Sequence, residues 1–234
     1  GNDEKKKPGQ AASAPIEVRL NGPHAVCVAK MQGYGSVLIV ADCWGNRLGI
    51  ASLEGQWLAQ IGCGAEGHSD DRIAAAAFNG PHGLCVGPTG YVYVADAYNQ
   101  CLRRVSKLRV EEETEGVGIV MGEVDTAAGS GEKGMVDGPV RTAKFCYPHD
   151  ITASLDATLP VLFACDFDNN CIRRIFTHEG ECETVTTFAG SQLGSSGHKY
   201  ANTRCAPSQA PSYPFSNKPR MLLPRSLVVQ GLLS

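Results

Sequence analysis

The amino-acid sequence predicts an all-β protein built from repeated units of four short antiparallel strands. The first observation behind this prediction is the composition. The chain has 27 glycines and 13 prolines in 234 residues, which indicates many tight turns between short strands. Hydrophobic residues make up 43% of the chain and charged residues 19%, enough for a sizeable apolar core. The second observation is a motif that returns along the chain, because an internal repeat decides the fold.

Each copy of the motif begins with a short apolar strand after a proline. The prolines are Pro23, Pro81, Pro148 and Pro224. A second strand then ends in an Ala-Asp or Cys-Asp step. The third strands begin at Leu48, Leu102 and Ile172, and the fourth strands are 57–61, 124–128 and 185–189. Apolar and β-branched residues dominate these runs, and Gly, Asn or Pro bounds them, as is typical of strands.

Four antiparallel strands per unit, repeated about an axis, are the blades of a β-propeller, a fold that limits exposed sheet edges. We therefore expect three complete blades and part of a fourth within residues 15–234, after a disordered polar tail at 1–14. The expected ranges are 20–62 for blade 1, 78–129 for blade 2, 145–190 for blade 3, 191–219 for a long loop and 220–234 for the start of blade 4. An open arc of blades exposes long edges. We expect a missing segment or a second chain to close the ring.

Three parts of the repeat resemble a known family. They are Pro81-His82-Gly83, then Tyr93-Val94-Ala95-Asp96, and Asn169-Asn170 followed by Ile172-Arg173-Arg174-Ile175. Together they resemble the NHL repeat, and the resemblance covers residues 20–190 well. It implies a closed ring, commonly of six blades, of which this chain would supply an incomplete ring or one half.

A histidine directly precedes the inner strand in each of the three blades: His24, His82 and His149. Inner strands line the central channel of a propeller, so three imidazoles approaching one axis are candidate ligands of a transition metal. Asp150 is a neighbouring carboxylate ligand for a hard cation. The default interpretation expects no cofactor and treats these residues as hydrogen-bonded structural histidines, with zinc or calcium as the alternative.

The chain is more distantly similar to the peptidyl-α-hydroxyglycine amidating lyases, whose propeller resembles the NHL family. The resemblance implies zinc held by histidines in Pro-His positions, here His24, His82 and His149, with Asp150 at the position of a calcium-binding aspartate. In those lyases the histidines come from alternating blades, whereas here they come from consecutive ones. This resemblance supplies one alternative function, a metal-dependent lyase or related enzyme with a histidine-lined central channel.

Two further repeat positions carry polar side chains. They are Asp42, Asp96 and Asp166, followed four residues later by Asn46, Gln100 and Asn170. Because each set recurs at the same place in every blade, we expect a structural role. The carboxylate should accept a bond from a backbone N–H at the second hairpin, as such side chains commonly do in turns.

Some NHL domains bind single-stranded RNA on a basic face with aromatic residues, so the resemblance implies a second alternative function, the binding of single-stranded RNA by a matching set in this chain. Its arginines are Arg47, Arg103, Arg104, Arg173 and Arg174, and its aromatic residues are Trp44, Tyr98 and Phe167. Alternate residues of a strand face opposite sides, so at most one member of each Arg pair lies on a given face. An acidic loop at 111–115 and a net charge of −3 count against this alternative.

The ten cysteines leave the compartment open. Cys27 and Cys85 occupy one repeat position and fit small buried thiols. If a disulfide forms, Cys182 with Cys205 is the first candidate, because both flank the long loop. Residues 1–10 are polar and contain no signal-peptide pattern, and no apolar run is long enough to span a bilayer.

The sequence therefore favours a protein-interaction scaffold that presents a propeller loop face to a protein partner. This conclusion rests partly on excluding other functions. The GxGxxG strings at 62–67 and 129–134 lead into strands rather than helices, which indicates connectors and not nucleotide sites. No nucleophile elbow is present either. An enzyme is less expected than a binding module, and no membrane association is expected.

Overall fold

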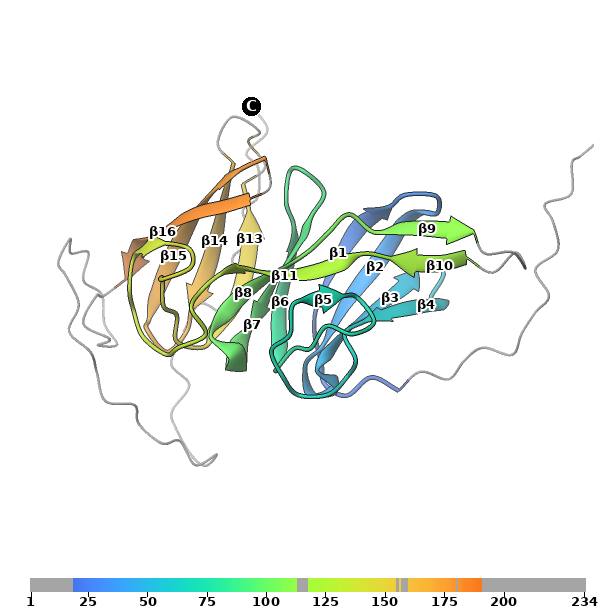
Figure 1. Ribbon diagram of the computed structural model, residues 1–234, viewed down its shortest axis with the longest axis horizontal. Coiled ribbons are helices and arrows are strands. Elements are labelled where there is room, and N and C mark those ends of the chain that lie inside the picture. The colour runs from blue at the N-terminus through green and yellow to red at the C-terminus, as the bar shows by residue number, and fades with distance from the viewer. Residues whose placement is uncertain (1–18, 113–117, 155, 157–159, 180, 191–234) are drawn as a thin grey trace, which may run out of the picture.

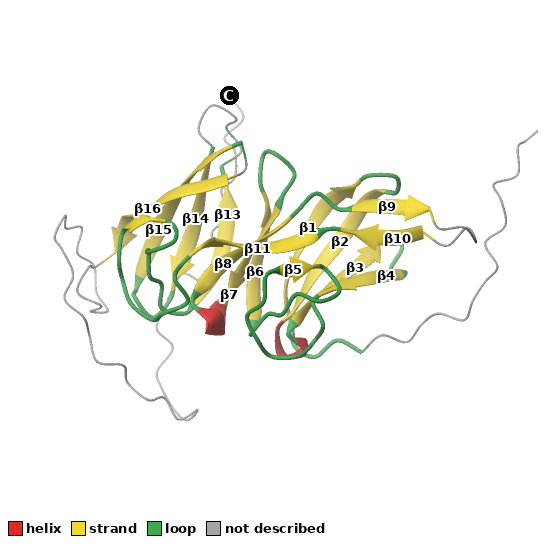
Figure 2. Cartoon of the chain, in the orientation of Figure 1, coloured by secondary structure: helices red, strands yellow, loops and turns green. Residues whose placement is uncertain are grey.

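A computed structural model describes residues 19–112, 118–154, 156, 160–179 and 181–190. This part of the chain is almost entirely β-structure, with only two short 3-10 turns (Figure 2). Its sheets stand side by side along the long axis of the molecule (Figure 1). Among the described residues, no helix is long and apolar enough to cross a membrane.

Blade 1 is a four-stranded antiparallel sheet in the order β1-β2-β3-β4. Its strands are β1 (Pro23–Met31), β2 (Gly35–Asp42), β3 (Arg47–Ser52) and β4 (Trp57–Ile61). The 3-10 turn η1 (Cys43–Gly45) joins β2 to β3. The sheet confirms the predicted blade architecture.

Blades 2 and 3 repeat this plan and add a short fifth strand on the outer edge. Blade 2 contains β6 (Pro81–Val86), β7 (Val92–Asp96), β8 (Cys101–Val105), β11 (Glu123–Ala128) and the added β5 (Asp71–Arg72), with η2 (Ala97–Asn99) after β7. Blade 3 contains β13 (Pro148–Ala153), β14 (Val161–Asp166), β15 (Cys171–His178), β16 (Glu181–Gly190) and the added β12 (Gly138–Pro139). The predicted tail, long loop and fourth blade lie outside the described residues.

A hairpin that the sequence did not predict interrupts blade 2. Its strands are β9 (Arg109–Glu112) and β10 (Gly118–Met121), and the first of them occupies part of the expected acidic loop. The hairpin reaches back to blade 1, where the N–H of Gln32 donates to Leu108 O (2.9 Å) and the N–H of Val110 donates to Gln32 O (2.9 Å). This contact ties blade 2 to the β1–β2 turn.

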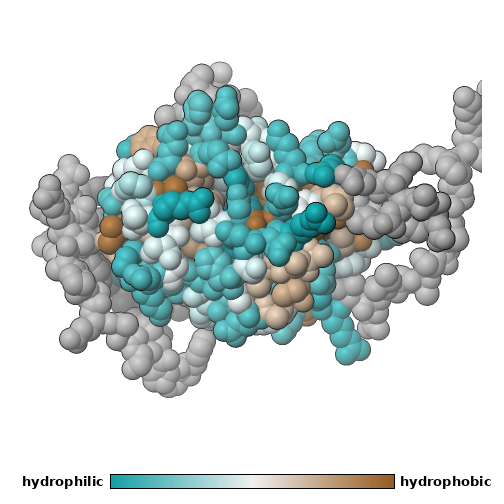
Figure 3. Space-filling model, viewed as in Figure 1, coloured by the Kyte–Doolittle hydropathy of each residue, from teal (hydrophilic) through white to brown (hydrophobic). Residues whose placement is uncertain are grey.

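The hydrophobic core lies between neighbouring blades. One cluster joins residues of blade 1, such as Ile39 and Ile50, to Phe78 and Val94 of blade 2. A second cluster joins Tyr93 and other residues of blade 2 to blade 3. The surface seen in Figure 3 is mainly hydrophilic, with apolar residues in small groups. Burial between blades therefore accounts for most of the apolar stabilisation.

The repeated aspartates bind the chain that leads into each inner strand. Asp96 accepts a bond from the N–H of Asn79 (2.8 Å), and Asp166 from that of Cys146 (2.7 Å). Asp42 accepts in the same way from the N–H of Asn21. The prediction that the carboxylate bonds a backbone N–H of the second hairpin was wrong, because the bonded N–H lies in the segment that leads into the first strand.

The positions four residues later adopt the left-handed conformation, with φ of 48° at Asn46, 55° at Gln100 and 51° at Asn170. Asn46 Oδ1 accepts a hydrogen bond from the N–H of Gly80 (3.0 Å), and Gln100 Oε1 accepts one from the N–H of Tyr147 (2.7 Å). Each bond crosses to the following blade. These side chains therefore connect consecutive blades.

Candidate functional site

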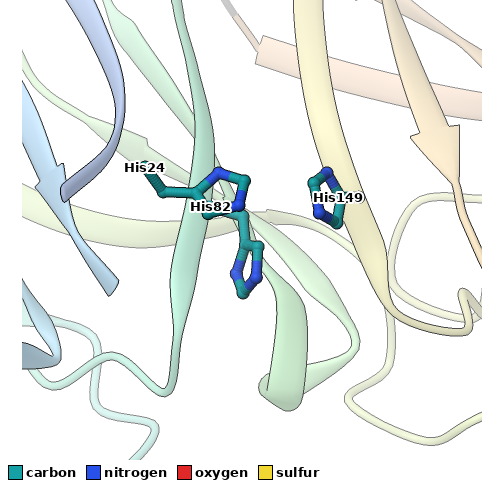
Figure 4. A group of neighbouring side chains, drawn as sticks. All are labelled: His24, His82 and His149. Carbon is teal, nitrogen blue, oxygen red and sulfur yellow. The ribbon is translucent and has the colours of Figure 1, made fainter. Parts of the chain in front are cut away.

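Three histidines from three blades meet where the inner strands begin (Figure 4). His24 lies on β1, His82 on β6 and His149 on β13, each directly after the proline that opens its strand. The ring centroids are 4.4 Å apart for His24 and His82 and 4.8 Å apart for the other two pairs. One potential ligand atom of each histidine lies within 4.8 Å of the others.

His82 is the buried member of this group, with 4% of its surface exposed. Its Nδ1 lies 2.7 Å from Gly80 O, so Nδ1 carries the proton and donates to that carbonyl. Nε2 then accepts from the Tyr147 hydroxyl at 2.9 Å. Burial lowers the pKa of His82 below its ordinary value of 6.5, with the charge of His24 adding to the effect. The imidazole is therefore neutral at neutral pH, with a lone pair on Nε2.

Tyr147 is a functional candidate that the sequence did not single out. It stands where the other blades have Gly22 and Gly80, and its φ is +57°, which is uncommon for a residue with a side chain. Burial raises its pKa, so the hydroxyl keeps its proton at neutral pH and can donate it. The sequence signal that could have identified Tyr147 is an aromatic residue, in place of glycine, directly before the Pro-His step.

Asp150 does not join the histidine group. Its Oδ1 accepts from the N–H of Ile151 (2.9 Å), and it packs so closely against Gly83 of blade 2 that a Cβ there would collide with it. The prediction that Asp150 supplies a carboxylate ligand beside the histidines was therefore wrong. Neighbouring residues of a strand point in opposite directions, which separates Asp150 from His149.

Next to the histidines lies a chain of aromatic rings that we call the aromatic row: Trp44, Tyr98, Tyr147 and Phe167. Successive ring centroids are 6.2, 5.2 and 6.0 Å apart. Trp44 is 55% exposed and Tyr98 40% exposed. The row runs through all three blades and touches the histidine group, since Phe167 stacks on His149 at 5.4 Å.

Two of the arginines predicted for a binding face are fully buried, which corrects that prediction. Arg103 binds Asp96 (3.0 Å) and Arg173 binds Asp166 (2.8 Å), inside blades 2 and 3 respectively. Each of these buried guanidinium groups neutralises a buried carboxylate, so it is not available to a binding partner.

The other three predicted arginines are also engaged. Arg47 binds Asp42 at 3.0 Å. Arg104 binds Asp125 and Glu181. Arg174 lies over the rings of Phe176 and Phe188, at 4.5 and 5.7 Å from the centroids. All five arginines therefore make ion pairs or ring contacts within the chain. The aromatic row is for this reason not the basic face that the sequence suggested.

No disulfide joins any of the nine cysteines within the described residues. Cys182 is among them, and its predicted partner Cys205 lies outside the described part of the chain. Cys43 is buried, with its Sγ 3.6 Å from Nδ1 of His82. Burial raises the pKa of Cys43 to about 11, so it is a neutral thiol beside the imidazole.

Four-stranded blades that pack face to face, with their inner strands opening at one place, define this chain as a segment of a β-propeller. The family comparison agrees: residues 78–104 match the NHL repeat. NHL repeat-containing protein 2 of Gallus gallus is 34% identical over 106 residues, which are 45% of this chain and 14% of that relative. Residues 78–104 are therefore an NHL repeat, which confirms the resemblance predicted from the sequence, and the chain spans about a seventh of the length of this relative.

Solved structures show weaker likeness. An auxiliary nutrient binding protein from Bacteroides thetaiotaomicron is 18% identical, with a TM-score of 0.46, over 71% of this chain and 35% of that one. Virginiamycin B lyase from Staphylococcus aureus is 16% identical, with a TM-score of 0.41, over 74% of this chain and 43% of that one. At these TM-scores the likeness carries no functional information.

Proposed function

We propose that this propeller segment binds a protein partner through the aromatic row. The observation that carries the proposal is the contiguous exposure of Trp44 and Tyr98 on rings that continue into Tyr147 and Phe167. Tyrosine and tryptophan anchor protein interfaces because they bury large areas with little loss of conformational freedom. NHL-repeat propellers commonly mediate protein interactions, which supports the same function.

The backbone beneath the row holds its two exposed rings in place. Gly22 and Gly80 have φ of +76° and +62°, and a Cβ on either would collide with the ring of Trp44 or Tyr98 respectively. Each ring thus rests directly on the chain leading into an inner strand. Anchors that are ordered before binding lose less entropy on binding, which favours affinity.

Charge favours a protein partner over single-stranded RNA. RNA binding along a row of stacking rings also requires cations for the phosphates. The five arginines that the sequence offered for this purpose are buried, ion-paired or stacked on phenylalanine. A partner with an apolar or aromatic segment suits the row better.

The test is to identify partners by crosslinking and mass spectrometry, and then to measure the affinity of each purified partner for three forms of the chain. Trp44→Ser with Tyr98→Ser should weaken binding by about tenfold or more, the size of effect that a hot-spot pair produces. Leu53→Ser is the matched control, because Leu53 is 58% exposed, at the end of β3 in the turn to β4. Equal affinity of a partner for all three forms would reject the row as its binding site.

A further inference from the structure

We propose that His24, His82 and His149 bind one transition-metal ion, with Zn²⁺ as the first candidate. The proposal does not depend on partner binding at the aromatic row, because the metal ligands are the ring nitrogens of the histidines and not the exposed rings of Trp44 and Tyr98. Three histidine ligands that leave a position for water are a common zinc arrangement. Imidazole also suits copper, iron and nickel, whereas calcium requires oxygen ligands. The absence of Asp150 from the group therefore favours a transition metal over calcium.

The hydrogen bonds of His82 prepare it as a ligand. A metal-binding histidine almost always donates its other ring N–H to a carbonyl or carboxylate. His82 makes this bond from Nδ1 to Gly80 O, which directs the lone pair of Nε2 away from the strand. The Tyr147 hydroxyl donates to Nε2 in the structure, so a metal ion would replace this single hydrogen bond.

The other two histidines can move toward His82. His24 is exposed, and within the described residues only ring contacts to His82 and His149 are found for it. His149 is half-buried. Zn–N bonds of about 2.1 Å place tetrahedral ligands roughly 3.4 Å apart. Their ligand atoms, now within 4.8 Å of one another, need to close by roughly 1.4 Å, a distance that imidazole rotation supplies without moving a strand.

Cobalt titration of the full chain, followed by absorption spectroscopy, tests the site. We expect one Co²⁺ per chain with a spectrum of nitrogen ligands, and Zn²⁺ should displace it. His24→Ala and His149→Ala should each weaken binding by about tenfold or more. His178→Ala is the matched control, because His178 is an exposed histidine at the end of β15, and it should leave binding unchanged.

Three results would overturn the proposal: no saturable binding, equal affinity in His24→Ala, or a thiolate-to-cobalt charge-transfer band. The last would assign the ion to some of the ten cysteines instead. Tyr147→Phe adds a second measurement, since it removes the hydrogen bond that competes for Nε2. Its affinity for Co²⁺ should rise by roughly two- to tenfold. A lower affinity would reject the competing role of the hydroxyl.

Discussion

Replacing Arg103 by methionine should destabilise the propeller far more than a surface mutation. Its two terminal nitrogens donate four hydrogen bonds, to Ala77 O (2.8 Å), Asp96 Oδ2 (3.0 Å), Ser69 O (2.8 Å) and Asp70 Oδ1 (2.8 Å). Methionine keeps most of the apolar stem but removes every one of these bonds.

The magnitude follows from what the mutation leaves behind. Asp96 is completely buried, so Arg103→Met leaves a buried carboxylate without its counter-charge. Breaking a buried ion pair by removing one partner costs about 3–5 kcal/mol. A domain is stabilised by only about 5–15 kcal/mol in total. With a urea m-value of about 2 kcal/mol/M, the unfolding midpoint should fall by roughly 1.5–2.5 M.

The cost should also depend on pH. Burial raises the pKa of Asp96 to about 6 even with Arg103 and Asn99 lowering it, and loss of Arg103 raises it further. A carboxyl with a raised folded-state pKa takes up a proton on folding. It therefore lowers the free energy of unfolding by an amount that grows as pH rises toward that pKa. Arg103→Met should therefore be more destabilising at pH 8 than at pH 6.

Urea unfolding followed by circular dichroism measures these effects, and Arg104→Met is the matched control. Arg104 binds Asp125 and Glu181, whose side chains are 45% and 68% exposed, and such pairs contribute about 0–1 kcal/mol. Adding Asp96→Asn to Arg103→Met should restore part of the stability, because an amide needs no counter-charge. If Arg103→Met and Arg104→Met have the same midpoint, the buried pair does not hold blade 2 together.

Two further predictions test the connections between blades and the state of the thiols. Gln100→Ala should lower the free energy of unfolding by about 1–3 kcal/mol in the same urea assay, because it leaves the N–H of Tyr147 without its 2.7 Å acceptor; an unchanged midpoint would exclude an important interblade bond. In the native chain, Cys63 should react quickly with a maleimide while Cys101 reacts only after unfolding, since Cys63 is exposed and burial raises the pKa of Cys101 well above its usual value. Peptide mass spectrometry measures the order of labelling, and simultaneous labelling would contradict the described burial.

The blades could be predicted from the sequence because the repeat is local. Each copy carries its own strands and turn residues within a short stretch. The alternation of apolar and polar residues, together with the turn residues that bound each run, is therefore enough to predict the strands. The short strands β5 and β12 could not be predicted this way. They are two residues long and form because a connector folds back on the blade that follows it. The β9–β10 hairpin likewise depends on pairing with Gln32 of another blade.

The candidate site was predictable in part for the same reason. The Pro-His steps placed three histidines on inner strands, but the partners of each side chain depend on distant residues. Strand alternation separates Arg103 from Arg104, yet Arg103 is the buried member because the connector at Ser69 and Asp70 closes over it. The role of Tyr147 could not be predicted, because its hydroxyl contacts His82 only through the packing of blade 3 against blade 2.

Blade 1 shows which parts of the repeat are needed for this arrangement and which can be replaced. At the position of Arg103 it has Gly49, and the ring of Trp57 occupies the space that a side chain there would fill. Arg47 binds Asp42 instead, so the buried carboxylate still has a cation. The aspartate is thus kept in all three blades, while its partner comes from two different positions.

The retained aspartate explains why the histidines meet. In each blade it binds the N–H three residues before the histidine: Asn21 before His24, Asn79 before His82 and Cys146 before His149. The interblade bonds of Asn46 and Gln100 reach the N–H two residues before the histidine of the next blade. Each of the last two histidines is therefore positioned by its own blade and by the preceding one. It follows that Gln100→Ala should weaken Co²⁺ binding although Gln100 does not belong to the histidine group, whereas Leu53→Ser should not.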